Sequence, residues 1–318
     1  MSKSSCVGIA AVAGASILWG MGTVASAGVL RTGVPVGAFT AVETCSSVLF
    51  LAVILRVSGV AISSVRRFWR AGALGLLEPG LTYFFFNLGL SRTSVTHAAL
   101  IQSLEPVFVA GLGWLLFRAT VPIRVLVPMV AALGGSAAVI TSQSVSGSAT
   151  FLGDGLVAAG ILCAAGYVLG VSRIDTTATS PLAVVFVQQL FACCLIVPLV
   201  AFRLNTGGVH RVVSITGHGS LWLWVGVAAI GVGSLSMSFW LYLIALRHLS
   251  VGITVQFLAV IPVVGFLGGI LVLGEHASTQ GVMGVVVVVA SLIAIGFARI
   301  HPRRSAQPEI GKGLKAVR

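Results

Sequence analysis

Residues 99–117 read ALIQSLEPVFVAGLGWLLF, an almost unbroken apolar run with a carboxylate, Glu105, and a proline, Pro106, near its middle. An α-helix needs about 20 apolar residues to cross the ~30 Å hydrocarbon core of a bilayer. A central carboxylate costs ~3 kcal/mol on insertion, whereas each Leu, Ile, Val or Phe returns ~0.3–0.6 kcal/mol. The run holds ten such residues. It is therefore predicted to cross a membrane, with Glu105 facing a polar cavity or a partner rather than lipid.

The rest of the chain has the same character. Of its 318 residues, 57% are hydrophobic and only 8% are charged, and the mean hydropathy is +1.09. Soluble proteins carry about a quarter charged residues. We therefore predict an all-α membrane protein with ten transmembrane helices, whose short connections leave no room for a soluble catalytic domain. The helices are expected near 7–30, 34–55, 70–90, 97–117, 124–142, 152–171, 181–202, 221–246, 251–273 and 280–297.

The basic residues are sorted by side of the predicted membrane. The net charge is +12, but with the N-terminus inside, 15 of the 19 Lys and Arg residues fall on the inner side. The other four are Arg31, Arg92, Arg203 and Arg211. This bias predicts that both termini are cytoplasmic. We expect the protein in a plasma membrane, such as a bacterial inner membrane. The same distribution argues against nucleic acid as a partner of the basic residues. The expected partner is the lipid bilayer.

The N-terminus resembles a cleavable signal peptide, because Lys3 precedes an apolar stretch that ends near Ala25-Ser26-Ala27. The apolar run is long for a signal core, and its removal would leave nine helices. We therefore expect this segment to be retained as the first span. The five cysteines are odd in number and lack metal-ligand spacing, so no metal and no cofactor is expected.

The chain has a weak internal repeat. Residues 82–108 align with residues 238–264 at a constant offset, with five of 27 positions identical and a proline at the same place in each. We divide the chain into residues 1–147, with helices 1–5, residues 148–300, with helices 6–10, and a basic cytoplasmic tail at 301–318. Because five is odd, the second half would enter the membrane with inverted topology. Inverted repeats around a central cavity are typical of transporters that work by alternating access.

Three acidic residues fall deep inside predicted spans: Glu43, Glu78 and Glu105. At ~1.5 Å per residue they lie at similar depth. No Lys or Arg lies at that depth, so desolvation and mutual repulsion favour the neutral acid. We expect at least one of them to carry a proton during part of a transport cycle. The alternative is that they are buried neutral acids that bond neighbouring backbone.

Prolines mark the same regions. Pro79 and Pro106 remove backbone donors and free the carbonyls of Gly75 and Gln102. In a membrane such groups persist only where protein or cavity water satisfies them. Pro262 would break the corresponding helix of the second half. These positions indicate a wet pocket, although the prolines could equally kink packed helices.

Further polar and aromatic residues within spans are candidates for the pocket wall. Aromatic faces and carboxylates suit an amphipathic or cationic solute. Each aromatic residue could instead serve in packing or at the membrane interface. With Glu43, Glu78 and Glu105, the predicted substrate-binding or coupling residues are Gln102, Tyr83, Asn87, Trp19, Tyr167, Trp240, Tyr242, Gln188 and Gln256.

Several short motifs resemble the EamA-type domain of the drug/metabolite transporter superfamily. They are Leu18-Trp19-Gly20, Leu104-Glu105-Pro106, Gly274-Glu275 and Gln280-Gly281. The resemblance covers residues 7–297 and implies a ten-helix bundle around a central cavity that moves amino acids, other metabolites or drugs, commonly outward. The sequence departs from the family at Phe117-Arg118, where a first-half Gly-Glu would map, and at Glu43, where the family often carries arginine.

The leading functional hypothesis is a secondary transporter that exports a small-molecule substrate, with protons as a possible coupling ion. An importer of a similar solute is the nearest alternative. An intramembrane enzyme is disfavoured, because the sequence has no acid-plus-nucleophile or metal constellation. Both a monomer and a homodimer stay open.

Overall fold

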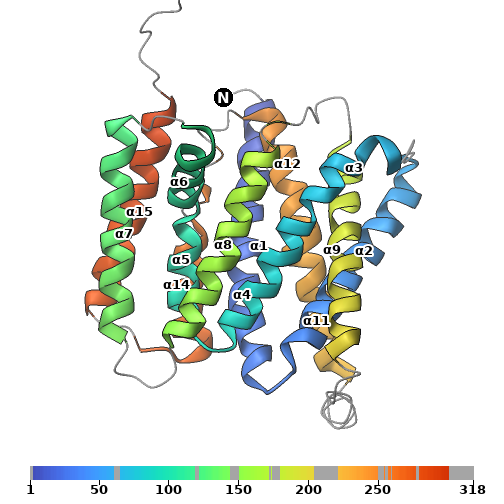
Figure 1. Ribbon diagram of the computed structural model, residues 1–318, viewed down its shortest axis with the longest axis horizontal. Helices are drawn as coiled ribbons and strands as arrows, with labels where there is room; N and C mark the ends of the chain where they lie inside the picture. Colours follow the sequence, from blue (N-terminus) through green and yellow to red (C-terminus); the bar gives the residue numbers. More distant parts are fainter. Residues whose placement is uncertain are drawn as a thin grey trace, which may run out of the picture.

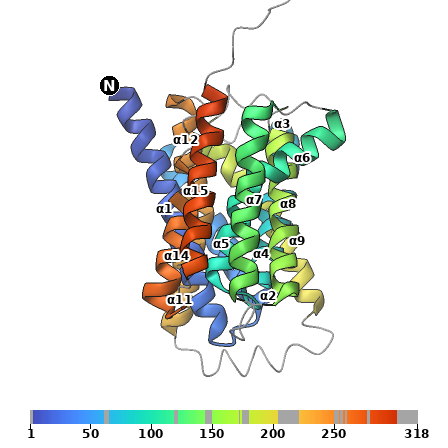
Figure 2. The ribbon, with the colours of Figure 1, turned by 90° about the vertical axis from the view of Figure 1, so that its left-hand side faces the viewer.

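The structure, a computed structural model, describes residues 3–60, 65–118, 122–143, 150–171, 173, 180–203, 221–249, 254, 257–258, 260–276 and 279–300. These residues form helices joined by turns, and no strand occurs among them. The helices run roughly alongside one another (Figures 1 and 2). The all-α prediction is confirmed for this part of the chain.

The first half contains several unbroken helices and two interrupted segments. The helices are α1 (Lys3–Arg31), α2 (Val36–Ser58) and α7 (Ile123–Gln143). The first interrupted segment is made of α3 (Val65–Leu74), the π-helical stretch η1 (Leu76–Leu81) and α4 (Thr82–Leu90). The second consists of α5 (Val95–Ser103) and α6 (Glu105–Phe117), which are bent by 42°.

The second half repeats this pattern. It begins with α8 (Phe151–Val171) and α9 (Pro181–Arg203). Next come α11 (Leu221–Gly231), the π-helical stretch η3 (Val232–Met237) and α12 (Ser238–His248). It ends with α14 (Val260–Leu273) and α15 (Thr279–Ile300).

The interruptions obey the offset of the sequence repeat. In that alignment residue 82 pairs with residue 238, which places Leu76–Leu81 opposite Val232–Met237. These are the bounds of η1 and η3. The same alignment pairs Glu105, the first residue of α6, with Ile261, the second residue of α14. The two halves thus share their points of interruption, although only the first has acids there.

Several helices are suited to a membrane. Among the described residues, five helices are long and apolar enough to cross one, and the bent pair α5–α6 makes a sixth if it counts as one span. Three shorter apolar helices lie within α7, α14 and α15. The chain is thus a multi-pass membrane protein by the length and composition of its helices.

The surface supports the same conclusion. Many large apolar side chains are exposed, including Leu49, Leu115, Leu271 and Val286 at 60–80% exposure. The buried set is by contrast rich in polar groups such as Thr40, Glu43, Asn87 and Gln188. Monomeric soluble proteins rarely expose such large apolar areas. This distribution suits a bundle surrounded by lipid.

Helices of the two halves alternate in space. α7 lies beside α15, α4 packs on α8, α1 contacts α12 and α14, and α2 packs on α9 and α11 (Figures 1 and 2). The largest apolar cluster accordingly includes Phe39 and Phe86 of the first half with Ile161 and Val227 of the second. A site at this contact is therefore built by both halves.

Candidate functional site

A cavity of about 80 Å³ lies where the interrupted segments meet α1, α2, α8 and α12. The lining residues are Trp19, Gly22, Thr23, Ser26, Glu43, Glu78, Thr82, Tyr83, Phe86, Asn87, Gln102, Glu105, Ile161, Ala164, Tyr167, Val168, Ser234, Phe239, Tyr242, Leu258 and Ile261.

The cavity gathers most of the predicted site residues. Those on its wall are Glu105, Glu78, Glu43, Gln102, Tyr83, Asn87, Trp19, Tyr167 and Tyr242. Gln188 is buried beside it and accepts a hydrogen bond of 3.3 Å from the Tyr167 hydroxyl. Trp240 packs instead against an apolar cluster that includes Leu51 and Leu182. Gln256 lies outside the described residues.

The backbone interruption at η1 brings Glu78 to the wall. Glu78 has extended dihedrals (φ −136°, ψ 121°) within an otherwise helical segment. The Gly75 carbonyl, which Pro79 was expected to free, accepts a hydrogen bond from the Gly80 N–H at 2.9 Å. The Thr82 hydroxyl similarly donates to the Leu77 carbonyl at 2.9 Å. Protein groups therefore satisfy these carbonyls without cavity water.

The break between α5 and α6 presents Gln102 and Glu105. Leu104 separates the two helices, so Pro106 lies in the first turn of α6. Pro262 likewise lies in the first turn of α14. A proline costs little there, because the first N–H groups of a helix have no intrahelical partner. Pro106 and Pro262 thus lie at the start of a helix rather than in its middle, whereas Pro79 lies inside η1.

Glu43 has one oxygen fixed and one free. Asn87 donates from Nδ2 to Glu43 Oε2 at 2.9 Å and to Thr40 Oγ1 at 3.1 Å. Glu43 is fully buried, and its Oε1 has no hydrogen-bond partner within the described part of the chain. The same holds for Gln102 Oε1. Two acceptor atoms of the wall are therefore unpaired.

Aromatic rings form another part of the wall. Trp19 meets Phe239 edge-on with ring centroids 5.2 Å apart, and Tyr242 at 5.6 Å. The Tyr83 hydroxyl lies 3.4 Å from the Ser234 carbonyl, which links α4 to η3. Glu78 and Ser234, a pair in the sequence repeat, both reach the cavity. Ser26, Thr82 and Ser234 also line it, and no feature of the sequence distinguished them from other small polar residues.

A second cavity of about 120 Å³ adjoins the first. It shares Gln102, Glu105, Val168, Tyr242, Leu258 and Ile261 with the first cavity and adds residues of α6 and α15, among them Pro106, Val109 and Leu292. Glu105 thus lies on the boundary between two spaces.

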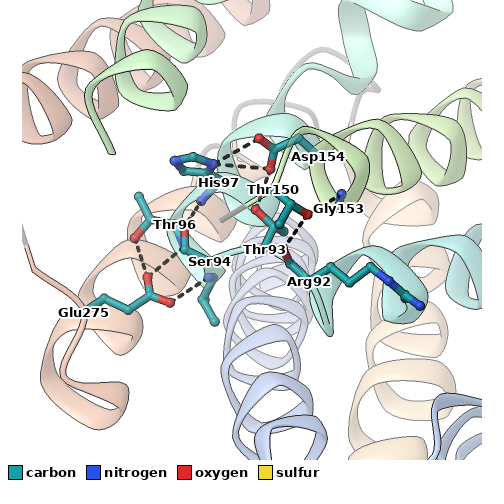
Figure 3. Close-up of polar contacts among 10 residues, drawn as sticks. Arg92, Thr93, Ser94, Thr96, His97, Thr150, Gly153, Asp154 and Glu275 are labelled. Atoms are coloured by element: carbon teal, nitrogen blue, oxygen red, sulfur yellow. Dashed lines mark hydrogen bonds and ion pairs between the residues drawn. The ribbon is translucent and has the colours of Figure 1, made fainter. Parts of the chain in front are cut away.

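A separate polar cluster joins helix ends (Figure 3). Glu275 Oε1 accepts from the Val95 N–H at 2.8 Å, and Oε2 accepts from the Thr96 N–H at 3.1 Å and its hydroxyl at 2.9 Å. Arg31 completes the cluster with an ion pair to Glu275. Glu275 thereby ties the start of α5 to the ends of α1 and α14. The sequence identified Glu275 only as part of a motif.

A neighbouring pair joins the first turn of α5 to the first turn of α8. His97 Nδ1 is 3.2 Å from both carboxylate oxygens of Asp154, and the Thr93 hydroxyl donates to the same carboxylate (Figure 3). No cluster of three or more His, Cys, Asp or Glu suited to a metal occurs among the described residues. These contacts fasten α8 to α5 and lie apart from the cavity wall.

Comparisons with known proteins agree with this architecture. The model of the EamA-like transporter family matches residues 7–141 and again residues 151–297. A solved crystal structure, described only as that of a protein, is similar over 96% of this chain and 99% of its own, with a TM-score of 0.63 and 19% sequence identity. At that identity the likeness shows the fold alone. No curated protein matches the chain.

Proposed function

Because the chain belongs to the EamA-like transporter family, we propose that it is a secondary active transporter that exports a small metabolite, amino acid or drug from the cytoplasm by alternating access. One observation carries the proposal: the cavity is lined by residues of both family matches at their shared points of interruption. Substrate sites of secondary transporters occur at such interfaces between repeats.

The proposal includes a topology. Ten crossings form two inverted five-helix repeats, residues 1–147 and 148–300, in a plasma membrane with both termini cytoplasmic. The excess of Lys and Arg on one side supports this orientation. Inversion follows from five crossings in the first half, and it lets the halves exchange shapes and open one site to either side.

The proposal also includes coupling to protons. Glu43, Glu78 and Glu105 line one cavity, whose described lining residues include no Lys, Arg or His. Ionised carboxylates that share a site repel one another, and a proton on one relieves the repulsion. At least one carboxylate is therefore proposed to bind a proton during the cycle.

A metabolite panel tests the proposal. Cells with and without the protein are compared for solutes lost to the medium, and the solute found is then assayed in proteoliposomes with and without a pH gradient. Glu105→Gln is expected to lower transport at least tenfold. Trp114→Phe, which changes an exposed ring on the same helix, is the matched control. If the Glu105→Gln variant transports as fast as the unaltered protein, or if the rate does not depend on the pH gradient, the proposed proton coupling is wrong.

The same assay separates the alternatives. Inward movement under physiological gradients would identify an importer. An enzyme would yield a solute of changed mass, whereas a transporter relocates an unchanged one. Mass spectrometry of both compartments distinguishes these results.

A further inference from the structure

Two buried acceptor atoms of the cavity wall are unpaired within the described part of the chain. Glu43 Oε1 and Gln102 Oε1 are buried and have no partner among the described atoms. The tyrosine hydroxyls with described bonds, those of Tyr83 and Tyr167, already point at protein oxygens. Buried polar groups are nearly always paired in folded proteins. An occupant that completes this site must therefore bring donors.

The charge of the wall is of one sign. Three carboxylates line the cavity, and its described lining residues carry no basic side chain. An anionic group would enter without a counter-charge, and its oxygens could not donate hydrogen bonds to the unpaired acceptors of the wall. A zwitterion meets the same obstacle at its carboxylate. An ammonium group, with three donors and no acceptor, meets neither.

Glu43 is the carboxylate whose contacts best orient it to bind an ammonium group. Asn87 holds Oε2 at 2.9 Å and is itself anchored on Thr40, so the carboxylate is oriented before a ligand arrives. In the ionised carboxylate Oε1 is left for one strong bond, so the proton of the neutral acid leaves when the ammonium binds. Charge-assisted bonds of this kind are about twice as strong as neutral ones.

The rest of the wall suits an apolar body. Trp19, Phe239 and Tyr242 pack edge-on, and Phe86 and Ile161 extend the apolar surface. Aromatic faces also attract a cation directly. We propose that the cavity binds organic monocations that carry a protonated amine on an apolar or aromatic body, with the ammonium on Glu43 Oε1. This inference rests on the proposed transport function and narrows its substrate class away from amino acids.

Four compounds with one phenyl group test the charge preference. Phenethylamine is a cation, phenylalanine a zwitterion, 2-phenylethanol neutral and phenylacetate an anion. Each is titrated into the purified full chain in detergent by calorimetry. Phenethylamine is expected to bind at least about tenfold more tightly than the other three. Equal or tighter binding of phenylalanine or phenylacetate, or no saturable binding of the amine, overturns the inference.

Variants locate the charge. Glu43→Gln preserves size and is expected to weaken phenethylamine at least about tenfold while leaving 2-phenylethanol unchanged. Glu43→Asp keeps the carboxylate and is expected to keep the preference for amine over phenylalanine. Glu309→Gln removes the same charge beyond the described residues and is the matched control. An unaltered preference in a folded Glu43→Gln protein overturns the assignment to Glu43.

Transport is measured separately by counterflow in proteoliposomes. A preference for the amine without movement of any solute would refute the transport proposal and keep the cation site. Movement of another solute without binding of the amine would refute the cation site and keep the transport proposal.

Discussion

Asn87 fixes how Glu43 meets the cavity. One amide group bridges the Thr40 hydroxyl and the Glu43 carboxylate, and all three side chains are buried. Asn87 and Glu43 were predicted separately as site residues, because both lie inside predicted spans. Their contact depends on how α2 and α4 are rotated about their axes, which a count of residues along each helix does not determine.

Removal of this amide should destabilise the protein. Asn87→Ala leaves buried acceptors without a donor, which costs ~1–3 kcal/mol of unfolding free energy. In a Glu43→Leu background the cost should be smaller, since one acceptor is already gone. Unfolding by SDS in mixed micelles measures all four members of this cycle. Additive losses would mean that the two side chains do not interact.

The position of a residue along its helix was easier to predict from the sequence than the direction of its side chain. The rise of ~1.5 Å per residue placed Glu43, Glu78 and Glu105 at similar depth, and all three line one cavity. Trp240 also lies within a span, yet it packs on an apolar cluster, and Gln188 reaches the wall only through Tyr167. Both residues lie inside spans, as predicted, but the direction of their side chains is set by neighbours from distant parts of the chain.

At the scale of elements, η1 and η3 place the interruptions against other helices. η1 packs on α9, and Gly75 makes this approach possible, since a Cβ there would come within 2.6 Å of the Gln188 Cα. The sequence signalled η1 through Pro79. No such signal marks η3, which has neither proline nor acid. Its position could be inferred only by applying the offset of the repeat to η1.

Gly75→Ala should therefore separate η1 from α9. The new methyl group would meet backbone, which cannot move aside as a flexible side chain can, so we expect a loss of ~1–3 kcal/mol from overpacking. Gly111→Ala is the control, because nothing lies within 4 Å of its added Cβ and alanine favours the helix. Thermal unfolding in detergent should show a lower Tm for the first variant only. Equal Tm values would contradict this close approach.

Glu275 is a second element-scale feature. It satisfies N–H groups in the first turn of α5, where the helix dipole also favours a negative charge. Gly274 precedes it with φ +67°, a conformation that glycine adopts without strain. The Gly-Glu motif thus ends α14 and turns a carboxylate towards α5. These partners are about 180 residues apart in sequence, so no local pattern predicted them.

The two partners of this ion pair should differ in importance. Glu275→Ala leaves two backbone donors unpaired, at ~1–3 kcal/mol. Arg31→Ala removes a side chain that is 38% exposed, and exposed ion pairs contribute ~0–1 kcal/mol. SDS unfolding of both variants should give the larger loss for Glu275. The reverse order would show that the ion pair, rather than the capping of α5, stabilises this end of the bundle.

At the scale of the whole molecule, the halves interleave around the cavity instead of forming separate bodies. The repeat, the breaks near Pro79, Pro106 and Pro262 and the membrane-protein class were predictable, since each follows from hydropathy, proline or alignment. The choice of neighbours, such as α7 beside α15 and α4 beside α8, was not, because apolar helices of similar composition can pack in many orders. The ten crossings and the inverted orientation stay predictions.

The central claim is a cavity at mid-depth that water can enter. Single cysteines introduced into a cysteine-free protein test it most directly. The rate at which a membrane-impermeant trimethylammonium methanethiosulfonate labels each cysteine is measured in permeabilised vesicles, where the reagent reaches both faces of the membrane. Val168→Cys and Leu258→Cys lie on the wall shared by both cavities, whereas Leu49→Cys and Val286→Cys lie on the exposed apolar surface. The account predicts fast labelling at the first two positions and slow labelling at the others. Labelling at Val168 and Leu258 as slow as at Leu49 and Val286 would contradict it.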